Sequence, residues 1–115
     1  MTSIKNGIKD IITKTSDAAT NVDLKTKPVD RGETWCIQKV ACEDETNAYT
    51  SLRILVGGHG WEHLLAEEKT PSAGTLYWTD EPFFLYPGEF LVARFTGTTN
   101  GDKLKVYYTG YKVEA

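Results

Sequence analysis

The segment Tyr86-Pro87-Gly88-Glu89 precedes two strand-like runs, Phe90–Thr96 and Lys103–Val113, and this stretch of the sequence decides the fold. Proline fixes φ and glycine tolerates positive φ, so the Pro-Gly pair predicts a tight turn that leads into the first run. Apolar side chains recur at every second position of both runs, which is typical of antiparallel strands with one face on a core. Residues 97–102 supply a turn between the runs, and we expect the two strands to form the closing hairpin of the domain.

Further strand-like segments precede this pair and are separated by Gly, Pro and Asn turns. Residues 21–26 predict an edge strand, and residues 33–42 predict a central strand because both of its faces are largely apolar. A polar hairpin loop at 43–47 leads to the alternating run 49–56. We count roughly seven or eight short strands at intervals of about 8–12 residues, which predicts an all-β, antiparallel β-sandwich. The residues expected in its core are Leu52, Ile54, Val56, Leu91, Ala93, Phe95, Leu104 and Val106.

The beginning of the chain differs from the rest, so we divide it into an N-terminal segment, 1–18, and a β-sandwich domain, 19–115. Four isoleucines of the segment have the spacing of one helix face, at i, i+4, i+7 and i+8. They are Ile4, Ile8, Ile11 and Ile12. Two interpretations stay open. The segment is either a short helix or irregular segment packed on its own domain, or an arm that becomes ordered only against a neighbouring subunit.

The composition limits the classes of partner. With 115 residues the chain is long enough for one domain with its own core. Its net charge of −3 provides no positive field for a nucleic-acid backbone or an anionic membrane surface. No apolar run approaches the roughly 20 residues of a membrane span, and the start lacks the apolar centre of a secretory signal. We therefore expect a soluble protein, made in a cytoplasm, with no nucleic acid and no membrane among its partners.

The two cysteines are expected to be free thiols. Cys36 and Cys42 lie six residues apart, and on one strand this spacing separates them by roughly 20 Å, beyond the reach of a disulfide. Buried thiols of this kind pack as small apolar side chains and fit a reducing site of synthesis.

No segment predicts catalysis, a resident metal or a cofactor. His59 and His63 resemble a metal pair, but glycines around them disfavour a helix, and on a strand the rings would stand about 13 Å apart. Carboxylates in turns usually serve solvation and turn capping, and nothing in their spacing indicates the two facing catalytic carboxylates of a glycosidase. The sequence contains no nucleophile elbow, phosphate loop or dinucleotide fingerprint. We therefore expect a protein that is not an enzyme.

Aromatic side chains are the more informative candidates. If the alternation of the last strand is right, Tyr107 and Tyr111 share one exposed face with Lys103 and Lys105. Such a patch suits a protein interface or a platform on which sugar rings stack. Tyrosines that are merely half-buried on a sheet give the same pattern, so both interpretations stay open.

Several short motifs carry a resemblance to a known family. They are Ala-Gly-Thr-Leu-Tyr-Trp at 73–78, Tyr-Pro-Gly-Glu at 86–89, Ala-Arg-Phe at 93–95, Gly-Asp-Lys-Leu at 101–104 and Thr-Gly-Tyr at 109–111. Over residues 32–111 the chain resembles small jelly-roll proteins encoded among the virion genes of tailed bacteriophages. The motifs are turns and strands, not catalytic signatures. The resemblance implies a sandwich of jelly-roll type and a virion component that is oligomeric and often trimeric.

The function that the resemblance implies is structural. We expect a capsid decoration or cement protein on the virion surface, made in the host cytoplasm, that stabilises the head by binding the major capsid protein or other virion subunits. In such proteins a terminal arm often grips a neighbouring subunit, a role that would belong to the four isoleucines. The alternative is a carbohydrate- or receptor-binding module of a virion head or tail fibre, with Trp61, Tyr107 or Tyr111 as stacking platforms. A cupin-type enzyme would need regularly spaced His and Glu ligands, which the sequence lacks.

Overall fold

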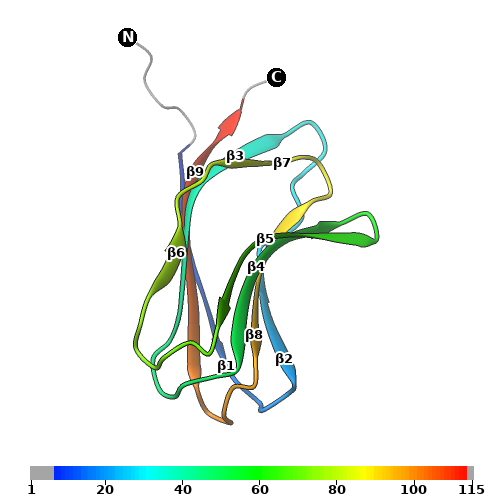
Figure 1. Ribbon diagram of the computed structural model, residues 1–115. Coiled ribbons are helices and arrows are strands. Elements are labelled where there is room, and N and C mark those ends of the chain that lie inside the picture. The colour runs from blue at the N-terminus through cyan, green and yellow to red at the C-terminus, as the bar shows by residue number, and fades with distance from the viewer. Residues whose placement is uncertain (1–6, 114–115) are drawn as a thin grey trace.

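The computed structural model describes residues 7–113, which form nine β-strands and no helix (Figure 1). The strands are β1 (Gly7–Thr15), β2 (Asn21–Lys25), β3 (Thr34–Asp44), β4 (Ser51–Gly58), β5 (Trp61–Lys69), β6 (Tyr77–Thr79), β7 (Phe83–Leu85), β8 (Phe90–Thr96) and β9 (Lys103–Val113). Within this range no helix has the length and apolar character needed to cross a membrane.

The strands form two antiparallel sheets that pack face to face (Figure 1). The first sheet has the order β1-β9-β3-β6, with β7 paired to another part of β3, and the second has the order β2-β8-β4-β5. This is the strand order of a jelly roll, so the predicted fold class is confirmed. β6 and β7 pair with separate parts of β3 and together occupy one strand position, which is why nine strands build a fold with eight positions.

The Pro-Gly turn forms as expected. The amide of Glu89 donates to the carbonyl of Tyr86 at 2.9 Å, which closes a four-residue turn, and Gly88 has a φ of +86°. The Glu89 carboxylate accepts a further hydrogen bond of 2.7 Å from the Tyr86 amide. Glu89 is therefore a buried acidic residue with a turn-stabilising role.

The closing hairpin is not formed, and that prediction was wrong. β8 pairs with β2 and β4 in the second sheet, whereas β9 pairs with β1 and β3 in the first. Residues 97–102 thus form a corner that carries the chain from one sheet to the other. The expected hairpin loop at 43–47 is another such corner, between β3 and β4. Alternation along a strand reveals which side faces the core, but it does not reveal which strand lies alongside.

The helix considered for the N-terminal segment is also wrong, because residues 7–15 are a strand. β1 pairs with β9 over its whole length, from Gly7 opposite Tyr111 to Thr15 opposite Lys103. Ile8 and Ile12 pack against the core, and Ile11 points outward with 54% of its surface exposed. The fourth isoleucine, Ile4, lies outside the described residues. Whether β1 also contacts a neighbouring subunit stays a prediction.

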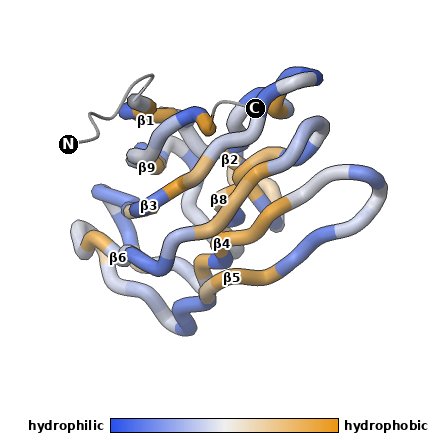
Figure 2. The backbone as a smooth tube through the Cα atoms, turned by 90° about the horizontal axis from the view of Figure 1, so that it is seen from above, coloured by the Kyte–Doolittle hydropathy of each residue, from blue (hydrophilic) through white to orange (hydrophobic). Residues whose placement is uncertain are grey.

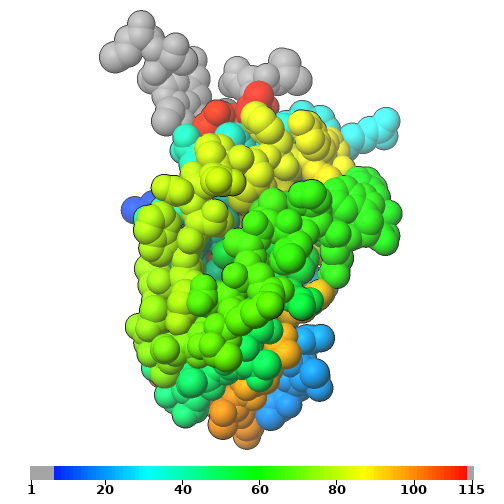
Figure 3. All heavy atoms as spheres, in the orientation of Figure 1, coloured from blue at the N-terminus to red at the C-terminus, as the bar shows by residue number. Residues whose placement is uncertain are grey.

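The core lies between the sheets and contains every residue for which burial was predicted. Each of them is at most 5% exposed: Leu52, Ile54, Val56, Leu91, Ala93, Phe95, Leu104 and Val106. Figure 2 shows the two layers from above, with strongly hydrophobic stretches along β4 and β8. β1 and β2 contact each other at one side of the sandwich. At the other side a hollow of about 130 Å³ lies between β5 and β6, lined by Ala66, Glu68 and Tyr77 among others (Figure 3).

A β-bulge in β3 changes which of its side chains face the core. The pairing of β3 with β9 shifts at Gln38, which is an extra residue in β3. Ile37 faces the core before the bulge and Val40 faces it afterwards. Ala41, which an unbroken alternation from Ile37 would place on the core side, therefore lies on the outer face of the first sheet. The bulge thus decides which side chains of β3 lie on the outer face of the sheet.

Candidate binding surface on the first sheet

Apolar side chains gather in rows on the outer face of the first sheet. One row crosses four strands, from β1 through β9 and β3 to β6: Ile11, Tyr107, Ala41 and Trp78. A second row runs from β9 through β3 to β7: Tyr111, Cys36 and Phe84. Thr109 and Lys39 are paired between the two rows. We call this surface the aromatic face and define it by seven large side chains: Ile11, Leu76, Trp78, Phe84, Tyr86, Tyr107 and Tyr111.

Much of the aromatic face is open to solvent. Five of its members are exposed by 58%, 55%, 54%, 50% and 44%: Trp78, Tyr86, Ile11, Phe84 and Leu76. Single exposed apolar residues are ordinary, but five gathered on one side of a sheet are typical of a contact surface. In the short strands β6 and β7, Tyr77 and Leu85 face the core. Their neighbours along each strand therefore point outward and belong to this group.

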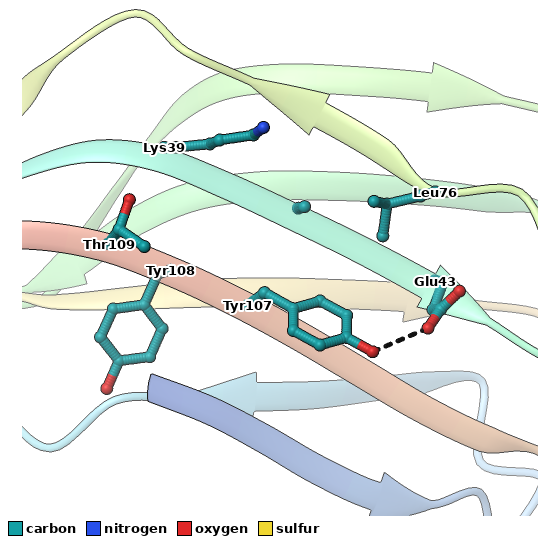
Figure 4. Close-up of a pocket in the computed structure, with 7 residues that line it drawn as sticks. Lys39, Glu43, Leu76, Tyr107, Tyr108 and Thr109 are labelled. Carbon is teal, nitrogen blue, oxygen red and sulfur yellow. Dashed lines mark hydrogen bonds between the residues drawn. The ribbon is translucent and has the colours of Figure 1, made fainter. Parts of the chain in front are cut away.

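A hollow of about 320 Å³ lies within the aromatic face (Figure 4). Ala41 forms part of its floor, and Leu76 and Tyr107 line it. The Tyr107 hydroxyl donates a hydrogen bond of 2.9 Å to the Glu43 carboxylate (Figure 4), and this bond raises the pKa of Tyr107. At the other end the Lys39 ammonium lies 5.0 Å from the centre of the Trp78 ring, within cation–π range. The hollow therefore offers an apolar floor between one acidic and one basic side chain.

The chemistry of this surface favours binding over catalysis. Tyr107 is held protonated by its bond to Glu43, and a phenol with a raised pKa is a poor general base at neutral pH. Cys36 is the buried member of the second row, and its contact with the Tyr111 hydroxyl raises the pKa of that tyrosine. What the face presents to a partner is ring surface and a few orienting polar groups.

The residues singled out from the sequence are distributed over several places. Tyr107 and Tyr111 do share one face with Lys103 and Lys105, and Ile11 joins them through β1. Ile8 and Ile12 point the other way, so the isoleucines do not form a common stripe. The sequence reasoning missed Trp78, Phe84, Tyr86 and Leu76 as members of this surface. In strands of three residues the alternation is too short to separate an inner from an outer side.

Trp61 and the two histidines belong to the β4–β5 hairpin of the second sheet. The rings of Trp61 and His63 meet edge to face, with centroids 6.3 Å apart. His59 lies in the hairpin turn with a φ of +53°, and its Nε2 is 3.0 Å from the Pro87 carbonyl oxygen. The histidines therefore have separate partners, and Trp61 does not share a surface with Tyr107.

Ion pairs cover part of the outer face of the second sheet. Arg94 of β8 donates to both carboxylate oxygens of Asp23 at 2.9 and 3.1 Å, and to both of Glu62 at 3.0 and 2.6 Å. The side chains of Leu55 and Val92 on the same face are only 3% and 1% exposed. Around Arg94 this face is therefore covered by charged pairs, whereas Leu64 of β5 is an exposed apolar side chain on it.

Both cysteines are free and buried, as predicted. They lie on β3, where Cys42 faces the core and Cys36 the outer side. Burial raises the pKa of the Cys42 thiol far above its ordinary value. A thiol that is not ionised is unreactive, so its role is packing.

No protein-family model and no curated protein matches the chain. Among solved structures, the Drosophila NLP core, described in connection with pentamer formation and histone binding, is 16% identical with a TM-score of 0.49, over 93% of this chain and 99% of that chain. A structure described as "CBM4 structure and function" is 13% identical with a TM-score of 0.42, over 91% of this chain and 82% of that chain. Similarity at this level carries no inference about function.

Proposed function

We propose that this chain is a non-enzymatic virion protein that binds the surface of a capsid through its aromatic face and thereby stabilises the shell. The observation that carries the proposal is the group of five exposed large apolar side chains on one side of the first sheet. The resemblance to jelly-roll virion proteins supplies the class of partner, namely the major capsid protein or another virion subunit.

The energetics of such contacts suit the residues present. Large rings bury much apolar area with little loss of side-chain entropy, and a few well-packed aromatic residues usually dominate the binding energy of an interface. The binding energy is added to the stability of the assembled shell by mass action, without any chemical step. Glu43 and Lys39 at the two ends of the hollow would orient the partner rather than supply most of the affinity.

Sedimentation of the purified protein with capsids from its source tests the proposal. We expect the wild-type protein to sediment with the particles, and both Trp78→Ala and Phe84→Ala to weaken binding by at least about tenfold, as loss of an aromatic hot spot does. Leu64→Ala is the matched control, because Leu64 is a 51% exposed apolar residue on the second sheet. Wild-type protein that fails to bind the capsids, or an equal loss in all three variants, would refute the proposal.

A second candidate function is glycan binding, and the hollow favours it. Its apolar floor lies between Glu43 and Lys39, and the Trp78 ring is 58% exposed beside it. Sugar rings stack on such aromatic faces while charged or amide groups bond their hydroxyls. A glycan array separates the two candidates, because a capsid-binding protein should give no signal on it. A signal that Trp78→Ala abolishes would favour the glycan.

A further inference from the structure

A row of polar side chains separates the two apolar rows of the aromatic face. Lys9 of β1 lies opposite Thr109 of β9, and Thr109 lies opposite Lys39 of β3. Lys9 and Thr109 stand two residues away from Ile11 and Tyr107 along their strands, so they point to the same outer side of the sheet. We call these three residues the middle row. It places two lysines across the centre of a surface that is otherwise largely apolar.

Neither ammonium group of the middle row has an ion-pair partner within residues 7–113. The ion pairs of the described chain use other lysines and the arginines. Asp10, next to Lys9 in the sequence, points to the opposite side of β1, where it accepts a hydrogen bond of 3.3 Å from the Tyr108 hydroxyl. The middle row therefore presents two positive charges that no carboxylate contacts in this part of the chain.

The polar groups at the two ends of the hollow differ in what they can still bind. Glu43, at one end, already accepts the Tyr107 hydroxyl at 2.9 Å. Lys39 and Thr109 line the other end (Figure 4). The Lys39 ammonium lies 5.0 Å from the centre of the Trp78 ring, and because an ammonium has three donors it can bind a carboxylate while it stays against the ring. The hollow is therefore better suited to an acidic partner group at this end.

The spacing of the rows matches the spacing of side chains on a strand. Residues that point to one side of a strand are two apart, which corresponds to about 6.6 Å, and the three rows are separated by the same two-residue step along β9. Strands of two sheets packed face to face usually run within about 30° of each other. A partner strand aligned with β9 would thus place one side chain on the row of Tyr111, the next on the middle row and the third on the row of Tyr107.

We propose that the aromatic face binds a capsid strand with the pattern apolar-x-acidic-x-apolar, whose carboxylate lies over Thr109 and pairs with Lys9 and Lys39. This inference rests on the proposed function and adds the chemistry of the partner. The two apolar side chains pack on the aromatic rows and keep water away from the carboxylate, which strengthens its attraction to the lysines. A strand with a lysine at the central position is repelled, so the middle row selects among partners.

Sedimentation with capsids tests the role of the two lysines. Lys9→Met and Lys39→Met remove the charge and keep a long apolar side chain, and we expect each to weaken binding by about fivefold. Lys39→Arg keeps the charge and should bind within about twofold of the wild-type protein. Lys69→Met is the matched control, because Lys69 is an exposed lysine on β5 of the second sheet, and it should bind like the wild-type protein.

The dependence on salt separates this inference from the proposed function. The affinity of the wild-type protein should fall between about 0.05 M and about 0.5 M NaCl, because salt screens charges near the surface, and the Lys9→Met/Lys39→Met double variant should lose most of this dependence. If the lysine variants bind like the wild-type protein while Trp78→Ala does not, the inference is overturned and the proposed function stands. Wild-type protein that does not bind capsids refutes the proposed function, and the peptides below then decide the inference.

Two short peptides test the pattern without capsids. They are acetyl-Leu-Thr-Glu-Thr-Leu-amide and the same peptide with Gln in place of Glu, titrated into the protein while NMR follows the Trp78 indole and the Thr109 amide. We expect the Glu peptide to bind about fivefold more tightly than the Gln peptide, and we expect this difference to disappear in Lys39→Met. Equal affinities of the two peptides for the wild-type protein, or no binding of either, would overturn the inference.

Discussion

Gly110 shows how a single residue can be fixed by a neighbouring strand. It lies on β9 opposite Ile37, beside the bulge at Gln38. A Cβ atom at position 110 would overlap the carbonyl oxygen of Cys36 and lie 2.9 Å from the Cα of Ile37. The bulge brings the backbones of β3 and β9 so close that only hydrogen fits between them.

Gly110→Ala should therefore destabilise the fold by about 1–3 kcal/mol or more, because backbone atoms cannot move aside as a flexible side chain can. Urea unfolding followed by tryptophan fluorescence measures the change. Gly7→Ala is the control, since a Cβ there meets nothing within 4 Å and should alter the free energy of unfolding by less than about 0.5 kcal/mol. Equal stabilities for the two variants would contradict this account of the bulge.

At the scale of single elements, the sequence was most informative where a strand is long and has one clean apolar side. The bounds of β8 and β9 are as predicted, and their inward residues, such as Phe95 and Val106, are in the core. It was least informative in two situations. In β1, isoleucines at helical spacing happened also to fit a strand, because Ile8 and Ile12 are four apart and an even spacing satisfies both periods. In β6 and β7, three residues are too few to reveal a period.

The two sides of β1 allow a direct test of its strand assignment. Ile12 packs against the core, and Ile11 next to it is 54% exposed. We expect Ile12→Ala to lower the free energy of unfolding by about 1–3 kcal/mol and Ile11→Ala to change it by less than about 0.5 kcal/mol. Chemical denaturation of the two variants measures this difference. In a helix with both isoleucines on one face the two losses would be similar, so comparable values would contradict the strand.

At the scale of the whole molecule, the candidate surface is a product of topology. Trp78 and Tyr107 are 29 residues apart in the sequence and come to flank Ala41 only because β6 and β9 both pair with β3. A sequence can indicate that Tyr107 points outward, but it cannot indicate which residues stand beside it. The same holds for Asp44 and Asp102, which the sequence places in the loop 43–47 and the turn 97–102, and which the fold buries in contact with each other.

The buried pair makes the stability of the whole domain depend on pH. The pKa of Asp44 is raised in the folded protein, from about 3.8 to about 6, because burial disfavours its charged form. The folded state therefore binds a proton more tightly than the unfolded state does, and the stabilisation is complete below pH 3.8 and is lost as the pH rises through 6. We expect the urea midpoint to fall as the pH is raised from 5 to 7.

Asp44→Asn is the control for this pH dependence, because it keeps the shape of the side chain and cannot ionise. Its urea midpoint should be nearly constant between pH 5 and pH 7. The carboxyl groups with lowered pKa values, such as Glu62 and Asp102, change the stability only at more acidic pH, so they do not mask the effect. A midpoint of the wild-type protein that rises over this interval would contradict the assignment.

The pairing of β1 with β9 also has a consequence for how the chain folds. Residues 7–15 find their partners at residues 103–111, and β3 needs the same strand on its other side. While the chain is being synthesised, the first sheet has a gap at its centre until the last strand emerges from the ribosome. Such distant pairings make folding slow and leave apolar strands exposed in the meantime. Nascent chains arrested before residue 103 should therefore stay sensitive to protease and bound to chaperones, and release of the last strand should be the step that completes the domain.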